Sequence, residues 1–127
     1  GFENKIIFNT LMQCVGQYAS DCKIKQVWPK KHGYESVRIK RYLPDGKDEF
    51  LEHVDVTSHA TAKRFLVFFL YLTDNDEGQT VFPEQNFTSQ CKQGNVLIFP
   101  PLWPWQHAGR KPIETPKYIV GSYLHYT

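Results

Sequence analysis

From residue 35 onward the hydrophobic pattern repeats every two residues in short segments bounded by Gly, Pro and Asp. Residues 37–42 alternate between two faces, and the turn at Pro44-Asp45-Gly46 ends this predicted strand. Further extended segments are predicted at residues 50–55, 64–73, 81–83, 95–99, 106–108 and 117–126, with a polar turn at 74–78. Short strands at such close intervals predict a sandwich or barrel, and they argue against βαβ units.

One helix is predicted ahead of these strands, over about residues 5–24. Its apolar side chains recur at steps of three and four residues, at Phe8, Leu11, Met12, Val15, Tyr18, Ala19 and Cys22. Asn9 is expected to cap its N-terminus. A chain of 127 residues fits one domain, so we expect a single unit in which this helix supports a β core of about residues 35–127.

Composition and charge exclude several classes of protein. Aromatic residues make up 15% of the chain, which favours a β-rich interior. The longest apolar run, residues 65–72, is too short to span a bilayer, so no membrane partner is expected. The net charge of +2 gives no reason to expect nucleic acid. Basic residues gather before residue 48 and could attract an acidic peptide, but a solvated face is the preferred interpretation.

The three cysteines, Cys14, Cys22 and Cys91, are odd in number and form no C-x-x-C pair. This usage predicts reduced, mostly buried thiols, as in a cytoplasmic protein. The sequence makes no prediction of oligomeric state.

A candidate metal site begins with the H-x-D sequence of His53 and Asp55. Residues i and i+2 of a strand point to the same side, so both side chains can face one ion. His107 follows 52 residues after Asp55, on a later predicted strand. Two imidazoles and one carboxylate form the facial triad of non-haem Fe(II) enzymes, but zinc accepts the same ligands. The residues alone therefore leave the metal open.

Lys117 lies on the same face of its predicted strand as Ile119, Gly121 and Tyr123. If that face points into a barrel, Lys117 is a buried cation and needs an anion. The alternative is that Lys117 starts the strand and extends its amine to solvent.

Several motifs in this order resemble the Fe(II)- and 2-oxoglutarate-dependent dioxygenases, in particular the prolyl 4-hydroxylase-like branch. The resemblance extends from about Val37 to Tyr126. It rests on Arg41-Tyr42 before His53-Val54-Asp55, Arg64 before Leu70-Tyr71-Leu72, Gly78-Gln79-Thr80-Val81-Phe82-Pro83, Gly94-Asn95-Val96-Leu97-Ile98-Phe99, His107-Ala108-Gly109 and Lys117-Tyr118. The chain departs from the family pattern at Glu77, at Gln79, and at Tyr123, where many relatives have Trp.

The resemblance implies a double-stranded β-helix, a mainly β, cupin-like jelly-roll barrel with iron in its open mouth. It implies His53, Asp55 and His107 as Fe(II) ligands, and Lys117 as the partner of the distal carboxylate of 2-oxoglutarate. Tyr42, Tyr71 and Thr80 match further positions of the cosubstrate pocket. Arg64, Trp103, Trp105 and Tyr123 are expected around the substrate mouth, although packing at the end of the barrel is an equal alternative for the two tryptophans.

The implied activity is hydroxylation of a substrate C–H bond, coupled to decarboxylation of 2-oxoglutarate to succinate and CO₂. The cofactors are then Fe(II), 2-oxoglutarate and O₂, with ascorbate as a further reductant. The predicted substrate is a peptidyl proline. A nucleobase, free amino acid or small metabolite is the alternative within the same chemistry, and a metal-binding or structural jelly roll without catalysis is the alternative of another class.

Overall fold

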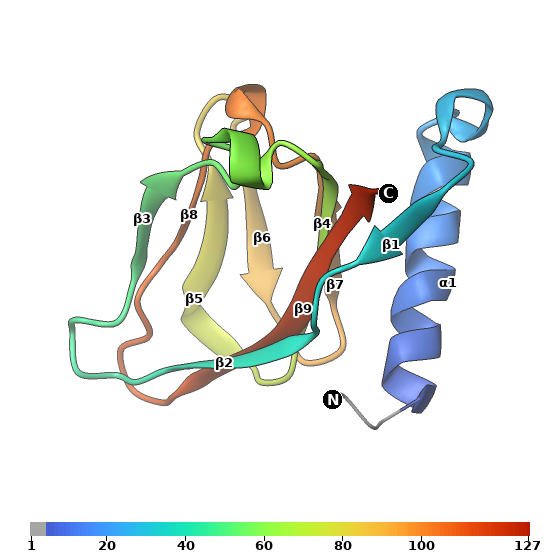
Figure 1. Cartoon of the computed structure of the whole chain (residues 1–127). Helices are drawn as coiled ribbons and strands as arrows, with labels where there is room; N and C mark the ends of the chain where they lie inside the picture. The colour runs from blue at the N-terminus through green and yellow to red at the C-terminus, as the bar shows by residue number, and fades with distance from the viewer. Residues whose placement is uncertain (1–4) are drawn as a thin grey trace.

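Two antiparallel sheets face each other in the structure, a computed structural model that describes residues 5–127, and a helix covers one of them (Figure 1). In chain order the elements are α1 (Lys5–Asp21), β1 (His32–Tyr34), β2 (Arg38–Tyr42), β3 (Phe50–His53), β4 (Arg64–Tyr71), β5 (Asn75–Phe82), β6 (Phe87–Cys91), β7 (Val96–Phe99), β8 (His107–Gly109) and β9 (Lys117–Tyr126). Single turns of 3₁₀ helix follow α1, β3 and β7, at η1 (Lys25–Val27), η2 (His59–Thr61) and η3 (Trp103–Trp105).

The strand order is that of a jelly roll. One sheet has the order β1-β9-β4-β7, with β2 also paired to β9, and the other has the order β3-β8-β5-β6. The ten-residue strand β9 pairs with β1, β2 and β4, so it joins the N-terminal strands to the centre of the sheet. The predicted mainly β, double-stranded β-helix with an N-terminal supporting helix is confirmed.

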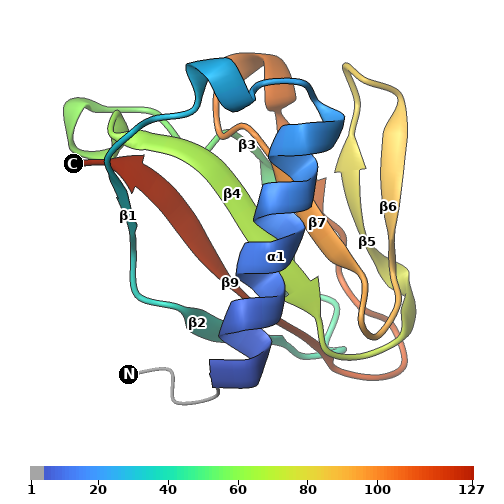
Figure 2. The same cartoon turned by 90° about the vertical axis from the view of Figure 1, so that its right-hand side faces the viewer.

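Helix α1 lies across the outer face of the β4–β9 sheet (Figure 2). Its buried Leu11 and Val15 pack against Leu66, Phe68 and Leu124 of that sheet. Burying a large apolar side chain contributes about 1.5–3 kcal/mol, so this cluster attaches the helix firmly. The predicted apolar face of the helix is therefore the face that it buries, except at Cys22, which lies beyond the end of α1 and is exposed.

The inner faces of the sheets form a second cluster between the layers. Val67, Phe82, Leu97 and Phe99 are buried there, and Phe69 packs against them. Successive residues of β4 point in opposite directions, so Leu66 and Phe68 serve the helix while Val67 and Phe69 serve the barrel interior. This confirms the prediction that residues 64–73 are apolar on both faces because both are covered.

Several local predictions are wrong. Asn9 lies inside α1, which already includes Lys5, so it is not an N-cap. The expected polar turn at residues 74–78 is largely the first half of β5, where the buried amide of Asn75 donates to the Thr115 carbonyl at 2.8 Å. Strands β1 and β6 were not predicted, because neither carries a clear apolar alternation.

The cysteines and the helix bear on two further expectations. All three thiols are free, but only Cys91 is buried, whereas Cys14 is half-buried and Cys22 is exposed. Among residues 5–127, no helix is long and apolar enough to cross a membrane.

Candidate active site

The two histidines of the site meet because their strands pair. β3 and β8 are antiparallel neighbours, and His53 lies directly opposite His107 in their register. Their ring centroids are 4.4 Å apart. The pairing of the two strands therefore sets the distance between the two imidazole rings.

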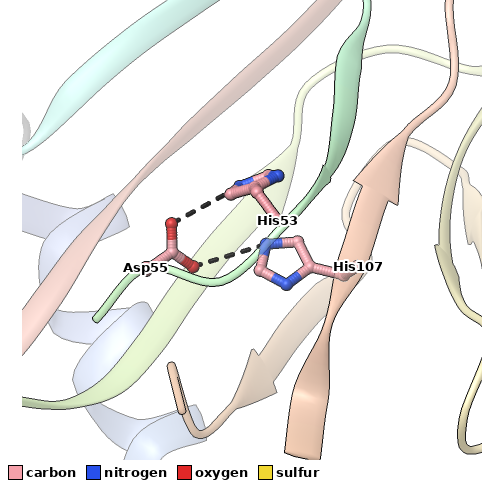
Figure 3. Close-up of side chains that lie close together, drawn as sticks. All are labelled: His53, Asp55 and His107. Carbon is pink, nitrogen blue, oxygen red and sulfur yellow. Dashed lines mark ion pairs between the residues drawn. The ribbon is translucent and has the colours of Figure 1, made fainter. Parts of the chain in front are cut away.

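Asp55 completes the cluster two residues beyond His53, where β3 has ended and the chain turns toward the η3 segment. Its backbone amide donates to the carbonyl of Pro101 at 3.1 Å. The carboxylate faces both rings from one side, with Oδ1 3.6 Å from His53 Nε2 and Oδ2 3.3 Å from His107 Nε2 (Figure 3). One ligand atom from each of the three residues falls within 4.8 Å of the others. The structure thus brings together the three residues predicted to bind the metal.

Both imidazoles have a fixed tautomer. His53 Nδ1 lies 2.6 Å from the Leu51 carbonyl, and His107 Nδ1 lies 3.0 Å from the Trp105 carbonyl. A carbonyl can only accept, so each Nδ1 carries the hydrogen and each Nε2 keeps its lone pair for a metal. Burial also lowers the pKa of His107, which favours the neutral ring that a metal requires.

Asp55 is held as a carboxylate. Burial opposes its ionisation, but the neighbouring His53 and His107 and the hydroxyl of Tyr123 together hold its pKa below the usual range. Tyr123 donates to Oδ1 at 2.9 Å. Oδ2 is buried and has no hydrogen-bond partner among residues 5–127. A buried carboxylate oxygen of this kind, 3.3 Å from the Nε2 atom of His107, fits a divalent metal ion.

Arg64 fixes the backbone of the same aspartate. Its guanidinium donates to both carboxylate oxygens of Glu35, at 2.7 and 2.9 Å, and to the Asp55 carbonyl at 3.0 Å. It also lies 3.9 Å from the ring centroid of Tyr123. Arg64 and Tyr123 were predicted around the substrate mouth; both line the cavity, and both contact Asp55. Their contact with substrate stays a prediction.

The cluster opens into a cavity of about 210 Å³ between the two sheets. Lys117 lines it and is only 2% exposed, so the alternative of an amine extended to solvent is wrong. Its Nζ donates to the carbonyls of Gly78 at 3.1 Å and Arg110 at 3.0 Å. No carboxylate of residues 5–127 forms an ion pair with it. Burial lowers the pKa of Lys117 to about 8.

Three side chains with hydroxyl groups, the predicted cosubstrate positions Tyr42, Tyr71 and Thr80, line the same cavity as Lys117. Tyr42 lies opposite Lys117 in the β2–β9 register, and the amine is 4.6 Å from its ring centroid. The hydroxyls of Tyr71 and Thr80 are 2.7 Å apart and buried. The cavity wall therefore carries hydroxyl donors in addition to the amine of Lys117; their contact with the cosubstrate stays a prediction.

The two tryptophans predicted at the mouth lie in η3, ahead of β8. Trp105 packs against the barrel core, and Trp103 is 75% exposed. Among the described residues, neither belongs to the cavity wall. The alternative of packing at the barrel end thus describes Trp105, and substrate contact by Trp103 stays a prediction.

Sequence reasoning did not assign three charged residues of the cavity wall to the site: Glu35, Arg38 and Lys40. The last two were detectable, because Arg38, Lys40 and Tyr42 share one face of the predicted strand. Glu35 gave no signal, since its pairing with Arg64 joins residues 29 positions apart.

Residues 37–125 match the 2OG-Fe(II) oxygenase superfamily. The match covers more than half of the chain and includes all three residues of the metal cluster, so the protein belongs to this superfamily. Its metal is accordingly Fe(II), and its cosubstrates are 2-oxoglutarate and O₂. No curated protein matches the sequence significantly.

Solved structures with the same fold include three prolyl hydroxylases. The viral collagen prolyl hydroxylase of Paramecium bursaria Chlorella virus-1, in complex with 2-oxoglutarate, is 22% identical with a TM-score of 0.73, over 94% of this chain and 74% of that one. The Trichoplax adhaerens prolyl hydroxylase, bound to a hypoxia-inducible factor peptide fragment, is 18% identical with a TM-score of 0.71, over 94% of this chain and 56% of that one. A Pseudomonas putida prolyl-4-hydroxylase is 13% identical with a TM-score of 0.69, over 98% of this chain and 69% of that one.

Proposed function

We propose that this oxygenase hydroxylates a prolyl residue within a peptide, with decarboxylation of 2-oxoglutarate to succinate and CO₂. The observation that carries the proposal is a single cavity whose wall holds the His53, Asp55 and His107 cluster together with Lys117. Lys117 is buried and forms no ion pair with a carboxylate of residues 5–127. The similar structures support the choice of substrate, since three are prolyl hydroxylases and one of them holds a peptide.

Lys117 would bind the distal carboxylate of 2-oxoglutarate. An ammonium has three donors, and two of them are used by the Gly78 and Arg110 carbonyls. The third is left for an anion, and a charge-assisted hydrogen bond to a carboxylate is short and strong. Tyr42 and the Tyr71–Thr80 pair would complete the binding of this end of the cosubstrate.

The three metal ligands would hold Fe(II), which, when bound, supplies the activation of O₂ for hydroxylation. The chain contributes orientation. The Leu51 and Trp105 carbonyls keep both Nε2 atoms directed at the metal, and Tyr123 engages Oδ1 of Asp55 so that Oδ2 is left as ligand. The layered aromatic core excludes water from one side of the site.

Succinate release with a panel of substrates tests the proposal. Proline-containing peptides should stimulate conversion of 2-oxoglutarate, whereas nucleosides, free amino acids and small metabolites should not. His107→Ala should abolish conversion, and anaerobic addition of Fe(II) and 2-oxoglutarate should then give no visible charge-transfer band. His59→Ala is the matched control, because His59 lies in η2 outside the cluster. Stimulation by a metabolite instead of a peptide would contradict the proposed substrate.

A further inference from the structure

Strand β2 places two cations without acidic partners in the cavity wall. Arg38 and Lys40 are two residues apart, so both point to the side on which Tyr42 lines the cavity. Both side chains are exposed, and neither forms an ion pair with a carboxylate of residues 5–127. The Lys40 amine lies 5.2 Å from the Phe50 ring centroid, at the edge of β3.

These two side chains differ from the other cations of the cavity. Arg64 is committed to Glu35, and Lys117 is enclosed by two carbonyls. Desolvation lowers the pKa of Lys40, the charge of Asp55 opposes this, and the charges of Arg38 and Arg64 lower the pKa further. The amine of Lys40 thus lies within the electrostatic reach of both arginines and of Asp55.

With Fe(II) and 2-oxoglutarate bound, the cavity keeps positive charge that no anionic group neutralises. Four cationic and two anionic side chains line it, with the histidines neutral. Fe(II) adds two positive charges, and the dianion 2-oxoglutarate cancels them. Asp55 is then used by the metal, Glu35 by Arg64, and Lys117 by the cosubstrate. The remaining positive charge therefore belongs to Arg38 and Lys40, on the β2 wall of the cavity.

We propose that the substrate peptide is acidic beside the hydroxylated residue, and that Arg38 and Lys40 bind its Asp or Glu carboxylate. The proposal rests on the proposed peptide hydroxylation and deepens it. An arginine fork and a neighbouring ammonium suit one carboxylate, and they also steer an anionic ligand toward the cavity. Two charges are too few to follow a phosphate backbone, which requires a longer row of cations.

Capped peptides that differ only in the residue before proline, Glu, Gln or Lys, provide the test. The Glu peptide should have a KM about tenfold below that of the Gln peptide, because two exposed ion pairs each contribute a few-fold. The Lys peptide should be poorest, and added salt should narrow the differences. Equal KM values for the three peptides would overturn the proposal.

Charge reversal separates recognition from a structural role. The double variant Arg38→Glu/Lys40→Glu should prefer the Lys peptide over the Glu peptide. The matched control is Lys30→Glu/Lys31→Glu, which makes the same charge change at exposed positions outside the cavity wall and should keep the original order. Retention of the Glu preference in the first variant, or an equal loss with all three peptides, would contradict the proposal.

Two further measurements distinguish failure of the acidic-substrate proposal from failure of the proposed peptide hydroxylation. Free L-proline carries its own carboxylate, and its preference over every peptide would overturn the assignment to a peptide. If no peptide is converted while 2-oxoglutarate alone still yields succinate, peptide hydroxylation itself is wrong. If peptides are hydroxylated without regard to charge, only the acidic substrate is wrong.

Discussion

Replacement of Lys117 by methionine gives the sharpest test of the buried cation. The two side chains are similar in length, but methionine carries no charge, so its burial has no free-energy cost for desolvating a charged group. In the folded protein burial lowers the pKa of Lys117 from 10.5 to about 8. The unfolded chain therefore holds this proton more tightly, and at pH 7 the shift costs the native state about 3 kcal/mol.

The sign and the pH window follow from the same two pKa values. The cost is fully present below pH 8, and it disappears as the pH rises toward 10.5, where the unfolded lysine also loses its proton. The stability of the wild type relative to Lys117→Met should rise by roughly 1 kcal/mol between pH 7 and 9, and by about 2.5 kcal/mol by pH 10. The variant also loses the hydrogen bonds to the Gly78 and Arg110 carbonyls, which changes its unfolding free energy by an amount that depends little on pH. The pH dependence of the stability difference therefore reports on the buried ammonium alone.

Urea denaturation of both proteins, at matched metal content from pH 7 to 10, measures this difference. A difference in unfolding free energy that stays constant across the range would refute the buried ammonium. In the same series, 2-oxoglutarate should stabilise the wild type and not Lys117→Met. Its affinity for the wild type should fall above pH 8, by up to about tenfold per pH unit, because binding then requires uptake of a proton. Lys117→Arg should show no such fall, since a guanidinium keeps its charge.

Two other predictions concern strand β9. Tyr123→Phe removes the hydroxyl that donates to Asp55, so affinity for Mn(II) or Co(II) in a titration should fall about tenfold, whereas Tyr126→Phe at the exposed end of the strand should leave it unchanged. Gly121→Ala drives a Cβ into the Phe68 carbonyl of β4, so thermal denaturation should show a large loss of stability or no folded protein. Gly16→Ala, in open space on α1, should instead stabilise by up to about 1 kcal/mol.

The metal cluster was predictable because strand periodicity is local. An H-x-D sequence in an extended segment places both side chains on one side, and a third ligand needed only a later strand that pairs with it. The face of residues 117–125 was predictable for the same reason, and Lys117 does line the cavity with Ile119 and Tyr123. Periodicity also gave the helix, since Leu11, Val15 and Ala19 are its buried residues.

The failures concern contacts that neighbouring residues do not encode. The first half of β5 looks like a turn because its polar residues find partners far along the chain, as Asn75 does at Thr115. Strand β6 is held by pairing with β5 at the sheet edge, and its polar residues Thr88 and Gln90 are exposed. The partner of Arg64 is Glu35, a contact that only the assembled sheet produces.

The helix and the active site are not independent parts, because the same two strands lie between them. Leu124 packs under α1, while its neighbour Tyr123 faces the barrel and holds Asp55. Phe68 is wholly buried on the helix side of β4, and its backbone lies against Gly121, where the two strands approach too closely for any side chain. Loss of α1 would expose Phe68 and Leu124 and loosen this approach. The segment that matches the superfamily, residues 37–125, therefore shares the packing of β4 and β9 with a helix that lies outside it.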